Sequence, residues 1–291
     1  MNRIAIVTDS NSGITQTESE NLGITVVPMP FYIDGELYYE DIDISPERFF
    51  RFQDSGADIT TSQPIAGDLL SLWRGLLETH DSVLYIPMSS GLSGACSTAT
   101  AMSQDFGGRV QVVDNQRISL TMRSSVYDAI KLADKGLSAK EIKEILEQDG
   151  LNATIYIMVD TLKYLRKGGR ITPAAAAIGS ILRIKPVLQI QGDKLDSFAI
   201  ARSVSQAKSI MCEALKHDFT TRFGCPEDGD GMQLDIAYTG SPNNAEAYMD
   251  ELKAVFPACA ASMVVNPLSL SVSCHIGSGA LAVAASKKLD V

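Results

Sequence analysis

The stretch LYIPMSSGLSGACSTATAM, residues 84–102, decides the fold, because it joins an apolar run to a helix through a bend of serine and glycine. The run LYIPM is short and continuous, as expected of a buried strand. The helix after the bend begins with small residues. A bend so rich in hydroxyls and so free of bulk is typical of sites that hold a phosphate, a carboxylate or a catalytic serine.

The same alternation of strand and helix continues on both sides of this stretch. Short apolar runs occur at 4–7 (IAIV), 24–29 (ITVVPM) and 109–114 (RVQVVD), and helical patterns separate them. This order predicts an α/β domain with a largely parallel sheet. The segment 31–39 (FYIDGELYY) predicts a hairpin, because Asp34-Gly35 is a strong two-residue turn signal.

A second unit begins after the amphipathic helix expected over 138–150. Strands are expected at 153–159 (ATIYIMV), 234–240 (LDIAYTG) and 261–268 (ASMVVNPL), with a hairpin over 187–200. A chain of 291 residues also exceeds the usual size of one domain. We therefore expect two α/β domains. The first spans 1–152 and is joined by a C-terminal helix over 275–291, and the second spans 153–274.

Composition excludes several classes of protein. The net charge of −10 and the pI near 4.8 argue against binding to nucleic acid, which depends on phosphate neutralisation. The five cysteines form no CxxC pair and are expected to be reduced thiols without a metal. The first residues do not form a signal peptide, and no stretch approaches the ~20 apolar residues of a membrane span. The sequence predicts a soluble cytoplasmic protein.

Chemistry is expected at four stretches: TTSQP (60–64), SSGLSG (89–94), RKGGRI (166–171) and CHIGSGALAVAA (274–285). We expect a helix to begin at Pro64 after the first stretch, and an alanine-rich helix to follow the glycines of the last. Hydroxyls and unpaired N–H groups at helix N-termini favour an anion. Each turn taken alone is also what an ordinary helix cap or helix end looks like.

A nucleotide site and a hydrolase nucleophile are the alternatives for these turns. The chain contains neither GxxxxGKS/T nor an early GxGxxG, so a nucleotide site is disfavoured. A serine hydrolase of acyl esters is the sharper alternative, since GLSGA almost fits GxSxG and the order Ser93, Asp235, His275 suits a catalytic triad. No HGGG-like oxyanion loop precedes it.

Taken together and in this order, the four stretches resemble the DegV family of bacterial lipid-binding proteins, which includes the fatty-acid-binding subunits of bacterial fatty acid kinase. The resemblance runs from IVTDS near the N-terminus to HIGSGAL near the C-terminus. Ser278 departs from the family, which commonly has proline there. The helix start GACSTA also departs, because the family commonly has an aromatic residue there.

The resemblance implies a two-domain α/β protein that holds one long-chain fatty acid between its domains. The carboxylate would lie against the Ser93 hydroxyl and the Gly94 N–H, with Thr61 and Ser62 nearby. Arg170 and His275 match the family's network behind that carboxylate. The small-residue stretches 95–102, 174–182 and 280–285 would suit the lining around the acyl tail.

The family also implies a carrier rather than an enzyme, with no cofactor beyond the bound acid. A separate ATP-binding kinase subunit would phosphorylate the acid, and the acyl phosphate would enter phospholipid synthesis. Arg202 matches a surface arginine expected to face that kinase. A monomer with transient membrane contact fits this role. A DegV-like carrier of another lipid, with no kinase partner, is a third interpretation.

Overall fold

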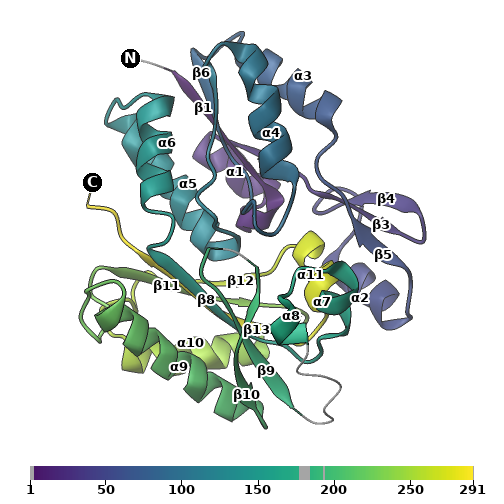
Figure 1. The fold of residues 1–291 in the computed structure, drawn as a ribbon, viewed down its shortest axis with the longest axis vertical. Coiled ribbons are helices and arrows are strands. Elements are labelled where there is room, and N and C mark those ends of the chain that lie inside the picture. The colour runs from purple at the N-terminus through teal and green to yellow at the C-terminus, as the bar shows by residue number, and fades with distance from the viewer. Residues whose placement is uncertain (1–2, 177–183, 193, 291) are drawn as a thin grey trace. The chain divides into compact units, whose positions relative to one another are not determined.

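The computed structural model describes residues 3–176, 184–192 and 194–290, which form two compact units (Figure 1). The first unit comprises Met1–Ser45, Ala57–Leu151 and Leu289–Val291, and the second comprises Pro46–Gly56 and Asn152–Lys288. The segment Pro46–Gly56 thus belongs to the second unit, although the chain returns to the first unit after it.

A four-stranded parallel sheet forms the centre of the first unit, in the order β2-β1-β6-β7, which confirms the predicted α/β fold. The strands are β1 (Ile4–Asp9), β2 (Thr25–Val27), β6 (Ser82–Ile86) and β7 (Val110–Val112). The strand order reverses between β1 and β6, and ligands of such sheets bind at the carboxyl ends of the strands beside this point.

Helices cover both faces of this sheet (Figure 1). On one face, α3 (Ala66–Leu76) and α4 (Ala95–Ser103) pack around the buried Trp73 and Tyr85. On the other, α1 (Gln16–Leu22), α5 (Ser119–Asp134) and α6 (Ala139–Gln148) pack against the alternate residues of the same strands. Each strand is therefore buried on both sides, which explains its continuous apolar sequence.

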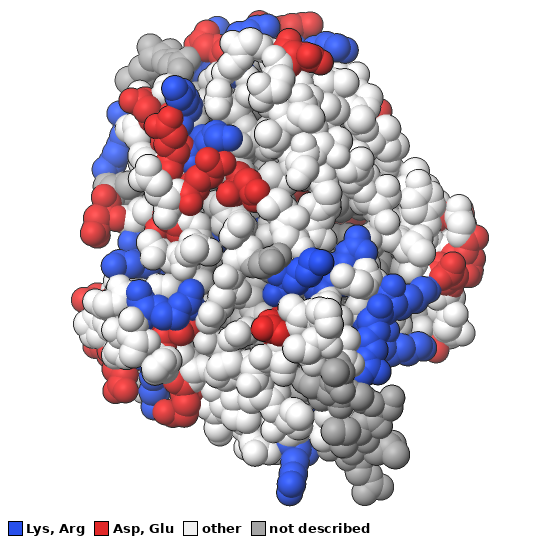
Figure 2. All heavy atoms as spheres, in the orientation of Figure 1, with Lys and Arg blue, Asp and Glu red and all other residues white. Residues whose placement is uncertain are grey.

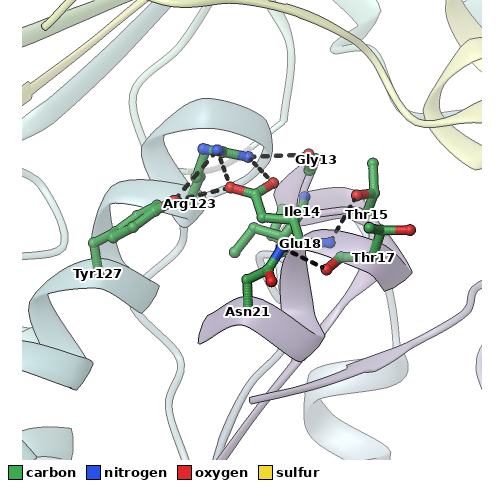
Figure 3. Close-up of polar contacts among 9 residues, drawn as sticks. Gly13, Ile14, Thr15, Thr17, Glu18, Asn21, Arg123 and Tyr127 are labelled. Carbon is green, nitrogen blue, oxygen red and sulfur yellow. Dashed lines mark hydrogen bonds and ion pairs between the residues drawn. The ribbon is translucent and has the colours of Figure 1, made fainter. Parts of the chain in front are cut away.

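A partly buried ion pair fixes the loop after β1 against α5 (Figure 3). Arg123 of α5 donates through Nη1 to Glu18 Oε2 of α1 (2.8 Å) and to the carbonyl of Gly13 (3.2 Å). The Tyr127 hydroxyl donates to the other oxygen of Glu18 (2.9 Å). Thr15 caps α1 by accepting from the Glu18 N–H. This loop is consequently held at the end of β1, where ligands of parallel sheets bind.

A small antiparallel sheet, in the order β4-β3-β5, also belongs to the first unit. The strands β3 (Pro30–Ile33) and β4 (Glu36–Tyr39) form the hairpin predicted from Asp34-Gly35, and both turn residues have positive φ. The third strand, β5 (Ile59–Thr61), carries the first two residues of TTSQP. The helix expected from Pro64 begins instead at Ala66, because Ile65 is extended and forms the N-cap.

The second unit is built on a six-stranded mixed sheet, in the order β10-β9-β8-β13-β11-β12. The strands are β8 (Ala153–Met158), β9 (Lys185–Ile190), β10 (Asp196–Ala201), β11 (Met232–Tyr238), β12 (Val265–Pro267) and β13 (Leu281–Lys287). One face packs against α9 (Val204–Thr221) and α10 (Asn243–Val255). The predicted hairpin over 187–200 corresponds to β9 and β10, which pair antiparallel.

The predicted C-terminal helix over 275–291 was wrong. A short helix, α11 (Leu270–Ile276), ends just after His275, and the alanine-rich segment forms β13 in the middle of the sheet. This strand pairs with β11 on one side and β8 on the other. Burial between two strands overrides the helix propensity of alanine, because the small side chains fit a sheet covered on its face.

Three short helices complete the second unit: α2 (Pro46–Asp54), α7 (Lys163–Gly168) and α8 (Pro173–Ala176). The buried Gln53 of α2 donates through Nε2 to the carbonyl of Ser273 on α11 (3.0 Å). This bond holds α2 beside α11. In the part of the chain that the structure describes, no helix is both long enough and apolar enough to span a membrane.

Candidate functional site

The elbow, residues 89–94, connects β6 to α4 at the carboxyl end of the parallel sheet. Ser89 organises it from a buried position. The carbonyl of Ser89 accepts from the N–H groups of Leu92 and Ser93 (both 3.1 Å), and its hydroxyl accepts from the Gly91 N–H (3.2 Å). The first serine of SSGLSG therefore shapes the turn, in which Leu92 is buried and Gly94 is exposed.

Donor groups at the start of α4 are left unused. The Ser93 hydroxyl accepts from the Ala95 N–H (3.2 Å), so its own O–H is available to donate. Among the residues that the structure describes, the Gly94 N–H has no acceptor. Gly94 is exposed and Ser93 is half-buried. A hydroxyl and an amide at a helix N-terminus form a site suited to a carboxylate or a similar anion.

The TTSQP segment lies against the same helix. The Thr98 hydroxyl of α4 donates to Gln63 Oε1 (3.0 Å), and the Ser62 N–H donates to the Pro30 carbonyl (3.1 Å). The first two of the four predicted stretches are thus brought together within the first unit. Thr61 is the last residue of β5, so its hydroxyl lies on a strand.

In the second unit, the α7–α11 corner (Gly168, Arg170 and His275) brings together the other two stretches. Helix α7 ends at Gly168, and Gly169 follows in the left-handed conformation, as the sequence RKGGR predicts. Arg170 then turns back and donates through Nη1 to the Gly168 carbonyl. His275 lies at the C-terminal end of α11 and packs against Gly168.

The contact between Gly168 and His275 leaves no room for a side chain. A Cβ placed on Gly168 would come within 2.2 Å of His275 Nδ1. Burial, and next the charge of Arg170, lowers the pKa of His275 from 6.5 to about 4. The imidazole is therefore neutral at neutral pH, and Arg170 supplies the positive charge of this corner. The sequence indicated Arg170 and His275 but missed the requirement for Gly168.

The glycine-rich turn after His275 is equally crowded. A Cβ on Gly277 would meet the ring of Tyr164 at 2.6 Å, and one on Gly279 would meet Asp160 Oδ2 at 2.7 Å. Both glycines have positive φ. Ser278 lies between them and is exposed, so the departure from the family's proline falls on a solvent-facing position.

Basic side chains surround this part of the second unit. Helix α7 exposes Lys163, Arg166 and Lys167, and α2 exposes Arg48 and Arg51. Figure 2 shows Lys and Arg gathered over α7 and α2, although the chain as a whole carries a net charge of −10. A local positive field of this kind favours anionic ligands.

The geometry of the second unit does not support the hydrolase triad. Asp235 Oδ1 on β11 accepts from Gln233 Nε2 (2.7 Å) and from the Val264 N–H (3.0 Å). His275 instead turns Nδ1 towards Gly168. A triad aspartate would raise the pKa of the histidine, whereas the pKa of His275 is lowered.

The remaining predicted residues fall in different settings. Arg202 is exposed between β10 and α9, and its backbone N–H donates to Gln206 Oε1 (2.8 Å). Of the small-residue stretches, 95–102 lies on α4 and 280–285 lies mostly on β13. In the stretch 174–182, residues 177–182 lie outside the described residues. Within the described ranges, no group of three or more His, Cys, Asp or Glu side chains could hold a metal ion.

Comparison with known proteins places these observations in context. The family model of the DegV proteins, described as uncharacterised, matches residues 3–288. A DegV domain-containing protein of Staphylococcus aureus is 30% identical over 290 residues, which cover 99% of this chain and 100% of that protein. Protein DegV of Bacillus subtilis is 30% identical over 284 residues, covering 96% and 98%.

Solved structures of DegV proteins superimpose on this chain over almost its whole length. A DegV family protein from Thermus thermophilus, described by its fatty acid binding, superimposes with a TM-score of 0.87 at 30% identity, covering 98% of this chain and 99% of that one. DegV of Bacillus subtilis, described as a fatty acid binding protein, superimposes with a TM-score of 0.84 at 28% identity, covering 99% and 100%.

Proposed function

The chain belongs to the DegV family, and we propose that it binds one long-chain fatty acid whose carboxylate lies at the elbow. The Ser93 hydroxyl and the Gly94 N–H would donate to the carboxylate oxygens. The observation behind this proposal is that neither donor has an acceptor within the described part of the chain. The two similar structures described as fatty acid binding support the choice of ligand.

The balance of free energies agrees with this ligand. Burial of an acyl chain contributes roughly 0.8 kcal/mol per methylene. A buried carboxylate without partners costs several kcal/mol, which would cancel much of that gain. Charge-assisted hydrogen bonds from a hydroxyl and a helix N-terminus offset this cost. The elbow therefore suits a ligand with one anionic end and a long apolar body.

We assign Thr61 and Ser62 to the surroundings of the same carboxylate. They precede Gln63, whose side chain accepts from Thr98 in the first turn of α4. A ligand held at the start of this helix lies within reach of the segment that contacts the helix there. The hydroxyls of Thr61 and Ser62 would add neutral donors to those of the elbow.

We assign Arg170 and His275 to the charged side of the carboxylate site. Arg170 supplies a permanent positive charge, and the neutral His275 supplies a hydrogen-bonding imidazole. The Gly168 carbonyl, which accepts from Arg170 Nη1, orients the guanidinium. The proposal thus combines neutral donors from the elbow with one cation from the α7–α11 corner.

We further propose that this protein is a monomeric cytoplasmic carrier and not an enzyme. A separate ATP-binding kinase subunit would phosphorylate the bound acid, and the acyl phosphate would serve phospholipid synthesis. Arg202, exposed at the start of α9, is assigned to the contact with the kinase.

Arg202→Ala tests the kinase contact. We expect it to reduce acyl phosphate formation with the kinase subunit by about tenfold, as loss of an interfacial arginine often does, and to leave fatty acid affinity unchanged. Lys216→Ala on α9, the helix that follows Arg202, is the control; Lys216 pairs with Glu213 (2.9 Å). Loss of lipid binding in Arg202→Ala would contradict the assignment.

The ligand itself is tested by mass spectrometry of the purified protein, first native and then denatured, with organic extraction of the released material. We expect one long-chain fatty acid per chain, lost on denaturation. An acyl group that stays attached to Ser93 would favour the hydrolase instead. A different extracted lipid would favour the carrier without a kinase partner.

A further inference from the structure

A cluster of buried polar residues, Thr8 to Ser12, lies where β1 ends, and the proposed function does not use it. Each of these residues is at most 8% exposed. Polar groups so deeply buried require hydrogen-bond partners, and the partners of this cluster lie on neighbouring strand ends. The Thr8 hydroxyl donates to the Ile86 carbonyl (2.9 Å), and the Ser10 hydroxyl accepts from the Met29 N–H (3.1 Å).

Asp9 is the ionisable member of this cluster and is fully buried. Its Oδ1 accepts from the Asn11 N–H (2.9 Å), and its Oδ2 accepts from the Met88 N–H (2.8 Å). Met88 is the residue immediately before the elbow. The side chain of Asn11 also donates to Met88 Sδ (3.1 Å), so Asp9 and Asn11 both hold the start of the elbow.

The far side of the elbow is held from the loop that follows β7. The Ser89 N–H donates to the Arg117 carbonyl (2.9 Å), and the Ser90 N–H donates to Asp114 Oδ1 (3.3 Å). Acceptors from both neighbouring strand ends therefore fix three successive N–H groups, from Met88 to Ser90. The elbow between them has little freedom to rotate, which keeps the donors at Ser93 and Gly94 pointing in one direction.

We propose that Asp9 is a positioning residue for the fatty acid carboxylate, because it fixes the start of the elbow and thereby the direction of the Ser93 and Gly94 donors. This inference rests on the proposed function. Asp9 would not touch the ligand. It would act only through the backbone of Met88 and the turn that follows.

A carboxylate is needed here rather than any polar side chain of the same shape. Both Asp9 oxygens face backbone N–H donors. An asparagine would place its NH₂ group against one of these N–H groups, so one buried donor would lose its acceptor. If the amide turned towards Met88, the elbow would lose its attachment. If it turned towards Asn11, the loop after β1 would shift.

Burial raises the pKa of Asp9 from 3.8 to about 6, and the N–H groups of Met88 and Asn11 oppose this rise. The ionisable groups around the cluster are Tyr85 on β6, Asp114 after β7 and the Glu18–Arg123 pair. Asp9 itself raises the pKa of Tyr85 further above its ordinary value. Protonation of Asp9 would place a proton on an oxygen that now accepts from the backbone.

The test compares Asp9→Asn with Asp128→Asn in binding of a fatty acid labelled with ¹³C at the carboxyl carbon. Asp128 is a matched control, because it is also buried in the first unit and has a raised pKa, but it pairs with Lys131 on its own helix. We expect Asp9→Asn to weaken affinity by about tenfold and to shift the bound ¹³C resonance. Asp128→Asn should change neither.

A folded Asp9→Asn protein with wild-type affinity and an unshifted resonance would overturn the inference. The wild-type protein provides a second measurement that does not depend on the folding of a variant. When the pH is lowered through 6, the Gly94 amide resonance should move with the same midpoint as the Asp9 carboxyl carbon. A Gly94 resonance that does not follow Asp9 would also overturn the inference. A wild-type protein that binds no fatty acid would instead overturn the proposed function, and this inference with it.

Discussion

The elbow and the α7–α11 corner use different chemistry to suit an anion. The elbow contains no charge at its outer end and relies on a hydroxyl and an amide that have no acceptor within the described residues. The corner contains a cation and an imidazole, and Arg170 is already bonded to the Gly168 carbonyl. The elbow thus presents its donors unpaired, whereas the corner is organised by contacts among its own residues.

This difference has a physical reason. Backbone N–H groups at a helix start are fixed by the helix, so they keep their direction without any partner. An arginine side chain has many rotamers and needs a local acceptor to hold it. Mutations at the corner should therefore disturb local structure first, whereas mutations at the elbow should disturb the ligand first.

The largest effect is expected from Gly168→Ala. The new Cβ would lie 2.2 Å from His275 Nδ1, so the ring and the end of α11 must move. Overpacking of this kind typically costs about 1–3 kcal/mol, and we expect the upper end because the new Cβ would meet ring atoms of the half-buried His275. Urea denaturation of the purified protein measures this loss.

Gly94→Ala is the matched control at the elbow. Gly94 has φ of −70°, and a Cβ there would meet only Gln63 Oε1, at 3.9 Å. Its stability should therefore stay within about 0.5 kcal/mol of wild type, as for ordinary surface substitutions. Equal losses in the two variants would remove the distinction between the elbow and the corner.

The elbow was predictable from the sequence because its signals are local. An apolar run, a serine-glycine bend and a small-residue helix each depend on a few neighbouring residues, and β6, the elbow and α4 follow them. The hairpin at Asp34-Gly35 was predictable for the same reason. The strand β13 was not, because ALAVAA becomes a strand only through its pairing with β11 and β8, which are distant in sequence.

The supporting residues of the site were harder to find. Gly168 is required only because His275 lies against it, and the two are separated by more than a hundred residues along the chain. Asp9 is the last residue of β1 and looks like an ordinary strand end in the sequence, and its bond to Met88 forms only when β1 and β6 pair. Such contacts become visible only once the topology is known.

A smaller effect on stability, but a clear one on binding, is expected from Ser93→Ala. Loss of a charge-assisted hydrogen bond should weaken fatty acid affinity by about 10- to 100-fold. The Ala95 N–H also loses its acceptor, which should cost about 1 kcal/mol of stability.

Displacement of a fluorescent fatty acid measures the affinity of Ser93→Ala. Ser97→Ala, exposed in the first turn of the same helix, is the control and should bind as wild type does. An unchanged affinity in Ser93→Ala would place the carboxylate elsewhere and would leave the elbow as an ordinary helix cap.

The smallest effect at neutral pH is expected from His275→Gln. The imidazole is already uncharged at pH 7, since its pKa is lowered to about 4, so only a neutral hydrogen bond is exchanged. Affinity at pH 7 should therefore fall by about fivefold at most. A larger loss would indicate that His275 carries a charge when the ligand is bound, and the corner would then supply two cations.

The pH dependence of stability tests the same point without ligand. The folded pKa of His275 lies below the ordinary value of 6.5, so the unfolded chain binds more protons between pH 6.5 and about 4. The contribution of His275 is therefore complete above pH 6.5 and is lost as the pH falls towards 4. Asp9 has the opposite effect on stability. Its folded pKa of about 6 lies above the ordinary value of 3.8, so Asp9 makes the folded state more stable as the pH falls from 6 towards 3.8. NMR titration of the His275 ring separates the two groups, and a midpoint near 6.5 would show that the corner is neither dry nor close to the charge of Arg170.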